Sequence, residues 1–586
     1  MDYFKSFSKI CLFVIGSVFA IILLKESFVQ KEQRSCVAAY DQFGYYSYLP
    51  ATFIYDDLAF QKPWKEKLQS YYCEQEIVYQ FVDLEGGKKV NMYHMGLSYL
   101  HLPGFVIANS LAKPLGYKQD GMSEPYRVAL KLTALFFILF GLIFFRKTLL
   151  LFFPDWIAGL VLLLVYGASN LFVTFYYGDL MPHLYLFTLN TIFIYSIVSY
   201  LKKEQWRYLL SAILILGLTV AIRPTQAIWG IVPFILFLYQ YKLSWKALKL
   251  LALFPLGALL MNFPQLLYWK IEGGSWIIMN LHSETLSFLK PYTLDFLFSF
   301  KKGWLLYSPL FIFSFVGIWL GLRQNKQLVT AISVFALINI YVLSSWDCWW
   351  YAASFGSRVM VDSYIVFGVL LGFFIQGASK SMKVLIPTLS IFFLIMGLSV
   401  FQSFQYFEGI IHNERMTKDY YWSVFGRTSA DQLDRSLLEI DRNDLNWDQN
   451  IFADHSMAKQ KGYKLIEKSL YRSQKRIEFG VDQEFISLSE NEFKLLLPTD
   501  EAKIRIRFNS SIDTSGKQQF LCAKIEGKKT YFEYYSVFDG EKTIGVFNLP
   551  VIRQTSDALK VFIYNPNKVP GFIEDIEISA IYLQRK

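Results

Sequence analysis

Long apolar runs recur along the first 401 residues, and they constrain this chain more than any other feature. A helix of about 20 apolar residues crosses the ~30 Å hydrocarbon core of a bilayer. The runs therefore predict a polytopic α-helical membrane protein with about eleven transmembrane helices, and the 54% apolar composition agrees with this class. The predicted spans are residues 8–24, 126–145, 156–176, 183–201, 208–222, 224–240, 247–269, 303–322, 328–345, 358–377 and 384–401.

The net charge of +10 does not indicate a nucleic-acid partner, because the basic residues are not gathered on one soluble module. They concentrate in alternate turns, which the positive-inside rule places in the cytoplasm. The loops at about 25–125, 270–302 and 346–357, and everything after residue 401, then face the non-cytoplasmic side. The basic turns contain Lys5, Lys9, Arg146, Lys147, Lys202, Lys203, Arg207, Lys242, Lys246, Lys249, Arg323, Lys326, Lys380 and Lys383.

Three regions follow from these patterns. Residues 1–401 form a transmembrane domain, whose first segment is interpreted as an anchor because Lys25 and Glu26 follow it without a small-residue cleavage site. Residues 402–463 form a connecting segment. Residues 464–586 alternate apolar and polar side chains, as in Ala502 to Asn509, which predicts antiparallel strands and a soluble all-β sandwich.

The first long loop, 25–125, is more than a linker. Residues 48–54 and 92–111 mix apolar and polar residues in lengths that suit helices lying in the membrane interface. Cys36 and Cys73 share this loop, and the spacing leaves open whether they form a disulfide. No cysteine–histidine spacing supports a structural metal site, and a catalytic divalent metal is not readable from the sequence.

A carboxylate flanked by aromatic residues, Asp41, follows the first span and begins a series of short motifs. The order of these motifs along the chain resembles that of the GT-C class of glycosyltransferases, which includes protein O-mannosyltransferases and lipid A aminoarabinose transferases. The chain is similar to bacterial members of this class. The resemblance covers about residues 8–401 and excludes the tail. The motifs are Asp41-Gln42-Phe43-Gly44-Tyr45-Tyr46, Pro103-Gly104-Phe105, Met181-Pro182-His183, Arg223-Pro224-Thr225, Lys302-Gly303-Trp304-Leu305-Leu306-Tyr307-Ser308-Pro309 and Phe355-Gly356-Ser357-Arg358.

The resemblance implies transfer of a sugar from a polyprenyl-phosphate-linked donor to a glycan, lipid or protein acceptor at the outer face of the bacterial cytoplasmic membrane. It also implies that Asp41 is the general base. Many members carry a second acidic residue next to this position, whereas this chain has Gln42. The alternative interpretation of Asp41 is a helix N-cap or turn residue. Asp56 and Asp57 are better explained as a helix start.

A leaving phosphate gains negative charge, so it requires fixed cations near the interface. Arg358 is the first candidate, although pairing with Asp362 at i,i+4 would also explain both residues. Lys301 and Lys302 are further candidates, with snorkelling to the interface as the alternative. Arg223 is the weakest, because Pro224 explains a tight reversal there without any function.

Other residues are candidates for positioning the substrates. Asp179 and His183 stand at i,i+4, a spacing that a local hydrogen-bonded pair would also explain. Asp347 lies in the aromatic run 346–351, which suits either sugar stacking or an interfacial aromatic belt. Tyr45 and Asp362 complete this set of candidates, which is Tyr45, Asp179, His183, Asp347 and Asp362.

Two other classes of function remain open. A transporter would explain many helices with charged residues at membrane depth, although no inverted repeat is visible in the hydropathy. A non-catalytic scaffold with a glycan-binding tail would explain residues 464–586, but it gives no reason for Asp41 and Arg358.

The charge pattern predicts that the first loop and the tail lie on the same, non-cytoplasmic side. Single cysteines placed in the tail and in the turn at Arg146 and Lys147, in a background without native cysteines, should label from opposite sides with a membrane-impermeant maleimide. Equal accessibility of the two positions would contradict this topology.

Overall fold

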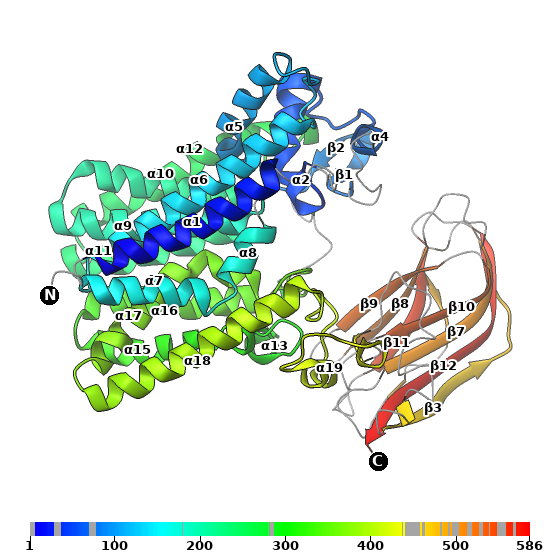
Figure 1. Cartoon of the computed structure of the whole chain (residues 1–586). Coiled ribbons are helices and arrows are strands. Elements are labelled where there is room, and N and C mark those ends of the chain that lie inside the picture. Colours follow the sequence, from blue (N-terminus) through cyan, green and yellow to red (C-terminus); the bar gives the residue numbers. More distant parts are fainter. Residues whose placement is uncertain are drawn as a thin grey trace. The chain divides into compact units, whose positions relative to one another are not determined.

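The computed structural model describes residues 6–28, 37–69, 78–178, 180–278, 281, 286–435, 437–439, 458–459, 463–480, 483, 485–489, 493–494, 503–512, 519–526, 531–537, 540–547, 558–565 and 570–585. The chain divides into two compact units, Met1–Phe404 and Gln405–Lys586, which are described separately (Figure 1). Cys36 and Cys73 lie outside the described residues, so the question of their pairing stays open.

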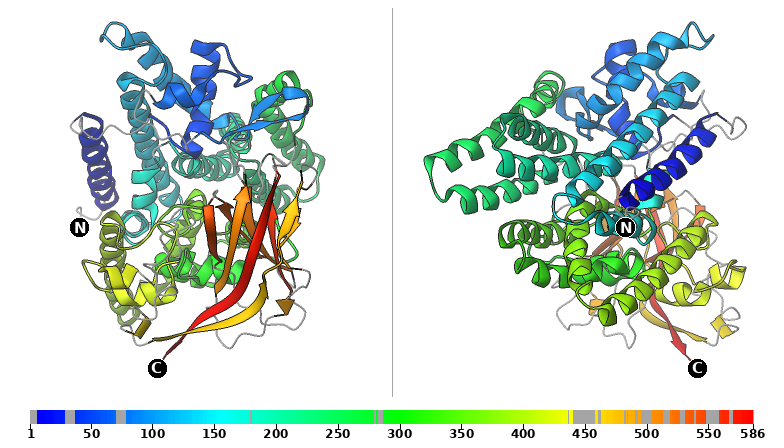
Figure 2. Two further views of the ribbon diagram at one scale, coloured as in Figure 1. Left: turned by 90° about the vertical axis from the view of Figure 1, so that its right-hand side faces the viewer. Right: turned by 60° about the vertical axis from the view of Figure 1, so that its left-hand side comes forward.

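The first unit consists mostly of apolar helices. Among the described residues, seven helices are long and apolar enough to cross a membrane, which confirms the predicted polytopic class. Figures 1 and 2 show the first of them, α1, alongside α6, against which it packs. The seven spans contain α1 Phe7–Phe28, α6 Glu124–Leu149, α9 Pro182–Lys203, α12 Trp245–Tyr268 with η6 Trp269–Gly273, α16 Lys326–Ser344, η8 Arg358–Ser363 with α17 Tyr364–Ala378, and α18 Met382–Phe407.

One further pair of helices is long and apolar enough to cross a membrane when the two are taken together, but the pair is bent. The predicted single helix 156–176 divides into α7 Asp155–Gly167 and α8 Leu171–Tyr177, which meet at a bend of 57°. Asn170 lies at this break, where its side-chain amide donates to the carbonyl oxygen of Phe355 at 3.0 Å and its side-chain oxygen accepts from the Tyr364 hydroxyl. Long-range polar bonds therefore hold the break, and the continuous helix expected from hydropathy alone is not found.

The other three predicted spans form shorter helices, so the count of eleven stays a prediction. Pro309 divides one of them, because proline lacks the N–H of a helix interior and clashes with the preceding turn, and Pro224 separates α10 from η5. The elements are α10 Trp206–Ile222, η5 Pro224–Gly230 with α11 Ile231–Tyr241, and α14 Trp304–Tyr307, η7 Pro309–Phe311 and α15 Ile312–Leu322. A further short helix, α13 Thr293–Phe298, precedes α14.

The first loop, between α1 and α6, packs in an apolar cluster that also takes side chains from α6 and α12. In this cluster the rings of Phe60 and Phe81 stack at 4.2 Å. The carboxylate of Asp57 accepts the backbone N–H groups of Gln61 and Lys62 and the indole N–H of Trp64. It therefore fixes the turn that leads into α4, which fits the structural interpretation of Asp57. The loop contains α2 Asp41–Tyr46, α3 Tyr48–Pro50, η2 Ala51–Tyr55, α4 Trp64–Gln69, β1 Phe81–Asp83, η4 Glu85–Gly87, β2 Lys89–Asn91 and α5 Gly96–Ala112.

The second unit begins with the end of α18 and two short helices, α19 Lys418–Val424 and α20 Gln432–Arg435, and continues as strands. Among its described residues, the strands form two five-stranded antiparallel sheets, as the alternation predicted. One apolar cluster takes side chains from both sheets, including Ile506 and Ile563. One sheet has β10 Gly540–Phe547, β7 Lys503–Ile512, β12 Gly571–Arg585, β3 Tyr463–Ser473 and β4 Ile477–Phe479; the other has β5 Phe485–Ser487, β11 Ala558–Tyr564, β8 Gln519–Glu526, β9 Tyr531–Val537 and β6 Phe493–Lys494.

One side chain of this unit departs from the alternation. Ile504, Ile506 and Phe508 are buried as expected, but Arg505, expected in solvent, is only 4% exposed. Its guanidinium contacts the Glu467 carboxylate of β3. Arg505 lies between Val546 of β10 and Ser579 of β12, its partners in the two neighbouring strands, whereas Arg507 on the same face is 29% exposed.

Candidate active site

Asp41 is the first residue of α2, and its carboxylate binds other side chains instead of capping the helix. Oδ1 accepts a hydrogen bond from the Tyr93 hydroxyl at 2.7 Å and another from the Tyr79 hydroxyl. Oδ2 lies 3.3 Å from Nη2 of Arg358, which is 317 residues further along the chain. The side chains of Asp41 and Arg358 are 29% and 16% exposed, so the ion pair is partly buried. These contacts argue against the N-cap interpretation.

The β1–β2 hairpin brings the two tyrosines to this carboxylate. The strands pair antiparallel with Phe81 opposite Asn91, so Tyr79 and Tyr93, two residues beyond them, emerge at the same end. Their hydroxyl oxygens lie 3.1 Å apart. The side-chain amide of Asn91 anchors the hairpin to α2 by donating to the carbonyl oxygen of Gly44 at 2.7 Å. A short hairpin thus fixes both donors to Asp41.

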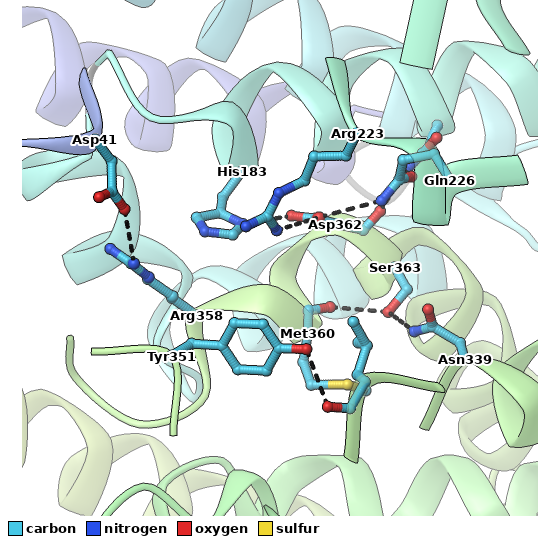
Figure 3. Close-up of polar contacts among 12 residues, drawn as sticks. Asp41, His183, Arg223, Gln226, Asn339, Tyr351, Arg358, Met360, Asp362 and Ser363 are labelled. Atoms are coloured by element: carbon cyan, nitrogen blue, oxygen red, sulfur yellow. Dashed lines mark hydrogen bonds and ion pairs between the residues drawn. The ribbon is translucent and has the colours of Figure 1, made fainter. Parts of the chain in front are cut away.

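A second polar cluster lies beside the first and centres on Asp362, which is buried (Figure 3). Its Oδ1 is 2.8 Å from Nδ1 of His183, at the start of α9. Its Oδ2 accepts from the Gln226 amide at 3.4 Å and lies 4.0 Å from Nη1 of Arg223. Asn190 donates to the main-chain carbonyl oxygen of Asp362 at 2.9 Å. Residues of three separate elements, α9, η5 and the end of α10, therefore converge on Asp362.

The two clusters face each other. Figure 3 shows the His183 ring between the Asp41–Arg358 pair and the Arg223–Asp362 pair. Nδ1 of His183 bonds to Asp362, whereas Nε2 is buried and has no hydrogen-bond partner among the described residues. Tyr45, which follows Asp41 in α2, lies beside Arg223 and links the two groups. Asp41, Tyr45, His183, Arg223, Arg358 and Asp362 are therefore neighbours in the fold.

Arg358 and Asp362 do not pair with each other, contrary to the i,i+4 alternative. Both lie on η8, a 3-10 helix with three residues per turn. Residues three apart are eclipsed there, so a residue four positions on points about 120° away. The geometry of η8 thus directs Arg358 toward Asp41 and Asp362 toward His183.

The remaining candidates lie around the loop 346–357. Nζ of Lys302, which is 2% exposed, donates to the carbonyl oxygen of Ser354, and Nζ of Lys301 lies 4.5 Å from the ring centroid of Trp350. Asp347 accepts a hydrogen bond from the Ser287 hydroxyl at 2.5 Å. These contacts organise the loop next to Arg358. Asp179 lies outside the described residues, so a contact between its side chain and His183 stays a prediction. The observed partner of His183 is Asp362.

Four residues of the two clusters were not among the sequence candidates. Asn190 and Gln226 carried a signal, because amide side chains within apolar helices need hydrogen-bond partners. Tyr79 and Tyr93 carried none, because their role depends on the pairing of two three-residue strands.

The surroundings of Asp41 determine its protonation. Burial alone would raise the pKa of this carboxyl, but the Arg358 guanidinium and the hydroxyls of Tyr79 and Tyr93 hold the pKa below its usual value. Burial and the charge of Asp41 raise the pKa of both tyrosines, so they remain hydrogen-bond donors at neutral pH. The site therefore presents two carboxylates and two guanidinium groups, so it can both bind an anionic ligand and accept a proton. Within the described part of the chain, no group of three histidine, cysteine or acidic residues is placed to hold a metal ion.

No protein-family model and no curated protein match the chain. Among solved structures, the chain is similar to the archaeal oligosaccharyltransferase AglB from Archaeoglobus fulgidus, in a complex with an inhibitory peptide and a dolichol-phosphate. The two are 13% identical with a TM-score of 0.43, and the match covers 71% of this chain. The chain spans 58% of the length of that protein.

The close packing of Gly44 against Tyr93 generates a prediction. A Cβ at position 44 would lie 2.2 Å from Cδ2 of Tyr93, so Gly44→Ala must displace the ring and should destabilise the protein by about 1–3 kcal/mol. Thermal unfolding in detergent measures the loss. Gly397→Ala in α18, where a Cβ meets nothing within 4 Å, is the matched control and should not destabilise. If Gly44→Ala unfolds like wild type, or costs as much in a Tyr93→Ala background, the packing argument is wrong.

Proposed function

We propose that this protein is a GT-C type glycosyltransferase of the bacterial cytoplasmic membrane. It would transfer a sugar from a polyprenyl-phosphate-linked donor to a glycan, lipid or protein acceptor on the non-cytoplasmic side. The observation that carries the proposal is the meeting of Asp41, from the first loop, with Arg358, at the start of η8. The lowered pKa keeps this carboxylate ionised and able to accept a proton at neutral pH, and the guanidinium groups beside it suit the release of a phosphate.

Asp41 is the proposed general base. The acceptor oxygen or nitrogen forms a bond to the anomeric carbon, its proton passes to Asp41, and the bond from that carbon to the phosphate oxygen breaks. The polyprenyl phosphate leaves with the electron pair and carries one more negative charge than it did in the donor. During this step Tyr79 and Tyr93 hold the carboxylate in place by their hydrogen bonds to Oδ1.

Arg358 and Arg223 are the proposed phosphate ligands, since both guanidinium groups lie beside the ring of His183. Lys301 and Lys302 are secondary candidates, because their described contacts organise the neighbouring loop. Asp347, with the aromatic residues around it, and Tyr45, His183 and Asp362 are proposed to position sugar and acceptor. The strand-rich tail, proposed to be a β-sandwich on the same side, would help to recognise the acceptor.

Asp41→Asn tests the base. The variant keeps the shape of the side chain but cannot accept a proton, so we expect transfer to fall by about 10²- to 10⁴-fold. Binding of the donor lipid should not weaken. Purified protein with a short-chain polyprenyl phosphosugar gives both quantities, after the unfolding temperature has shown that the variant is folded. Transfer near the wild-type rate would place the base elsewhere. Substrate flux without transfer in proteoliposomes would favour a transporter.

Arg358→Ala tests the electrostatics of the same pair through pH. A base acts only when deprotonated, so activity exists above the pKa of Asp41 and is lost as pH falls through it. The guanidinium is the largest of the groups that offset the burial of Asp41, so without it the pKa of this carboxyl rises and the acid limb of kcat/KM should move to higher pH. Arg358→Lys, which keeps a positive charge, should leave the limb nearer its wild-type position. An unmoved limb in Arg358→Ala would show that Asp41 is not the titrating base.

A further inference from the structure

The ion pair between Asp41 and Arg358 conflicts with the roles proposed for both residues, Asp41 as the base and Arg358 as a phosphate ligand. Each carboxylate oxygen offers two lone pairs, and those of Oδ1 already accept the hydroxyls of Tyr79 and Tyr93. A proton from an acceptor must therefore go to Oδ2, the oxygen beside the Arg358 guanidinium. While this contact lasts, Asp41 is a weakened base and Arg358 is engaged by a carboxylate instead of a phosphate.

The contact between the side chains of Asp41 and Arg358 is weak enough for another anion to replace the carboxylate. It is a single Nη2–Oδ2 contact of 3.3 Å and lacks the paired geometry of a bidentate guanidinium–carboxylate bond. Nε of Arg358 is buried and has no hydrogen-bond partner in the described part of the chain. The guanidinium is therefore held only in part by Asp41. An anion with several oxygens could satisfy it better.

We propose that Arg358 is an exchangeable partner of Asp41. In the resting protein it occupies Oδ2, and on binding of the donor it transfers to the phosphate, while Tyr79 and Tyr93 remain as positioning residues that keep Oδ1 in place. This inference rests on the proposed function and concerns the regulation of the same site. The base is unmasked only when the donor is bound.

Electrostatics favours this exchange as the reaction proceeds. The phosphodiester of the donor carries one negative charge, and the released polyprenyl phosphate carries a further one as the bond to the sugar breaks. The attraction of Arg358 to the phosphate then grows, whereas Asp41 loses its charge by taking the acceptor proton. The order of binding follows from the masking of the base: because Oδ2 is freed only when the donor holds Arg358, donor binding precedes productive acceptor binding.

The test measures binding of a short-chain polyprenyl monophosphate that lacks any sugar. Asp41 competes with this probe for Arg358, so Asp41→Asn should bind it about threefold to tenfold more tightly than wild type, as expected for loss of a partly exposed ion pair. Asp41→Ser removes the same carboxylate and serves if Asp41→Asn does not fold. In an Arg358→Gln background, Asp41→Asn should give no such gain.

Tyr93→Phe tests the positioning role. It should leave the affinity for the probe unchanged, lower kcat for transfer and move the acid limb upward, because the carboxylate loses a hydrogen bond that favours its charged form. The matched control is Tyr55→Phe in the same loop, whose hydroxyl donates to the carbonyl oxygen of Asp120 at 3.0 Å and should leave all three quantities unchanged. An unchanged acid limb in Tyr93→Phe would overturn this part of the proposal.

The outcomes separate the exchange from the proposed function. Unchanged or weaker probe binding in Asp41→Asn, or an equal gain in the Arg358→Gln background, would overturn the exchange. If Asp41→Asn loses transfer without binding the probe more tightly, the base assignment stands without the exchange. If Asp41→Asn binds the probe more tightly and still transfers sugar, the exchange stands and the base lies elsewhere.

Discussion

A partly buried ion pair between Asp41 and Arg358 closes the first loop onto the start of η8, and the rest of the candidate site depends on it. Removing one partner of a fully buried pair typically costs roughly 3–5 kcal/mol, and exposure of 29% and 16% reduces that cost here. The pair therefore joins two distant segments without locking them. Such a contact suits a site in which charged groups change partners.

The second carboxylate, Asp362, explains how further charge is tolerated among apolar helices. A buried ion needs both a counter-charge and hydrogen bonds. Asp362 has Arg223 as the counter-charge and His183 and Gln226 as hydrogen-bonding partners, and Asn190 binds its main chain. Because these partners come from α9, η5 and the end of α10, the cluster also fixes the relative positions of those helices.

Part of the site can be inferred from the sequence. The rarity of charges in and beside apolar segments singles out Arg223, Arg358 and Asp362, and the flanking aromatic residues after the first span single out Asp41. Their partners could not be inferred. The i,i+4 rule that would join Arg358 to Asp362 assumes an α-helix, and η8 is a 3-10 helix. Arg505 shows the same limit in the second unit, since period-two alternation places it in solvent, whereas its position inside a sheet buries it.

The sequence by itself determined the membrane class, the apolar segments and the strand-forming tail, because run length and periodicity are properties of neighbouring residues. Tertiary structure decided the break between α7 and α8, the hairpin that brings Tyr79 and Tyr93 together, and the partners of Asp41 and His183. These features depend on desolvation and hydrogen bonding between segments far apart in the chain. A carboxylate and a guanidinium 317 residues apart leave no local pattern, and only the folded chain brings them within 3.3 Å.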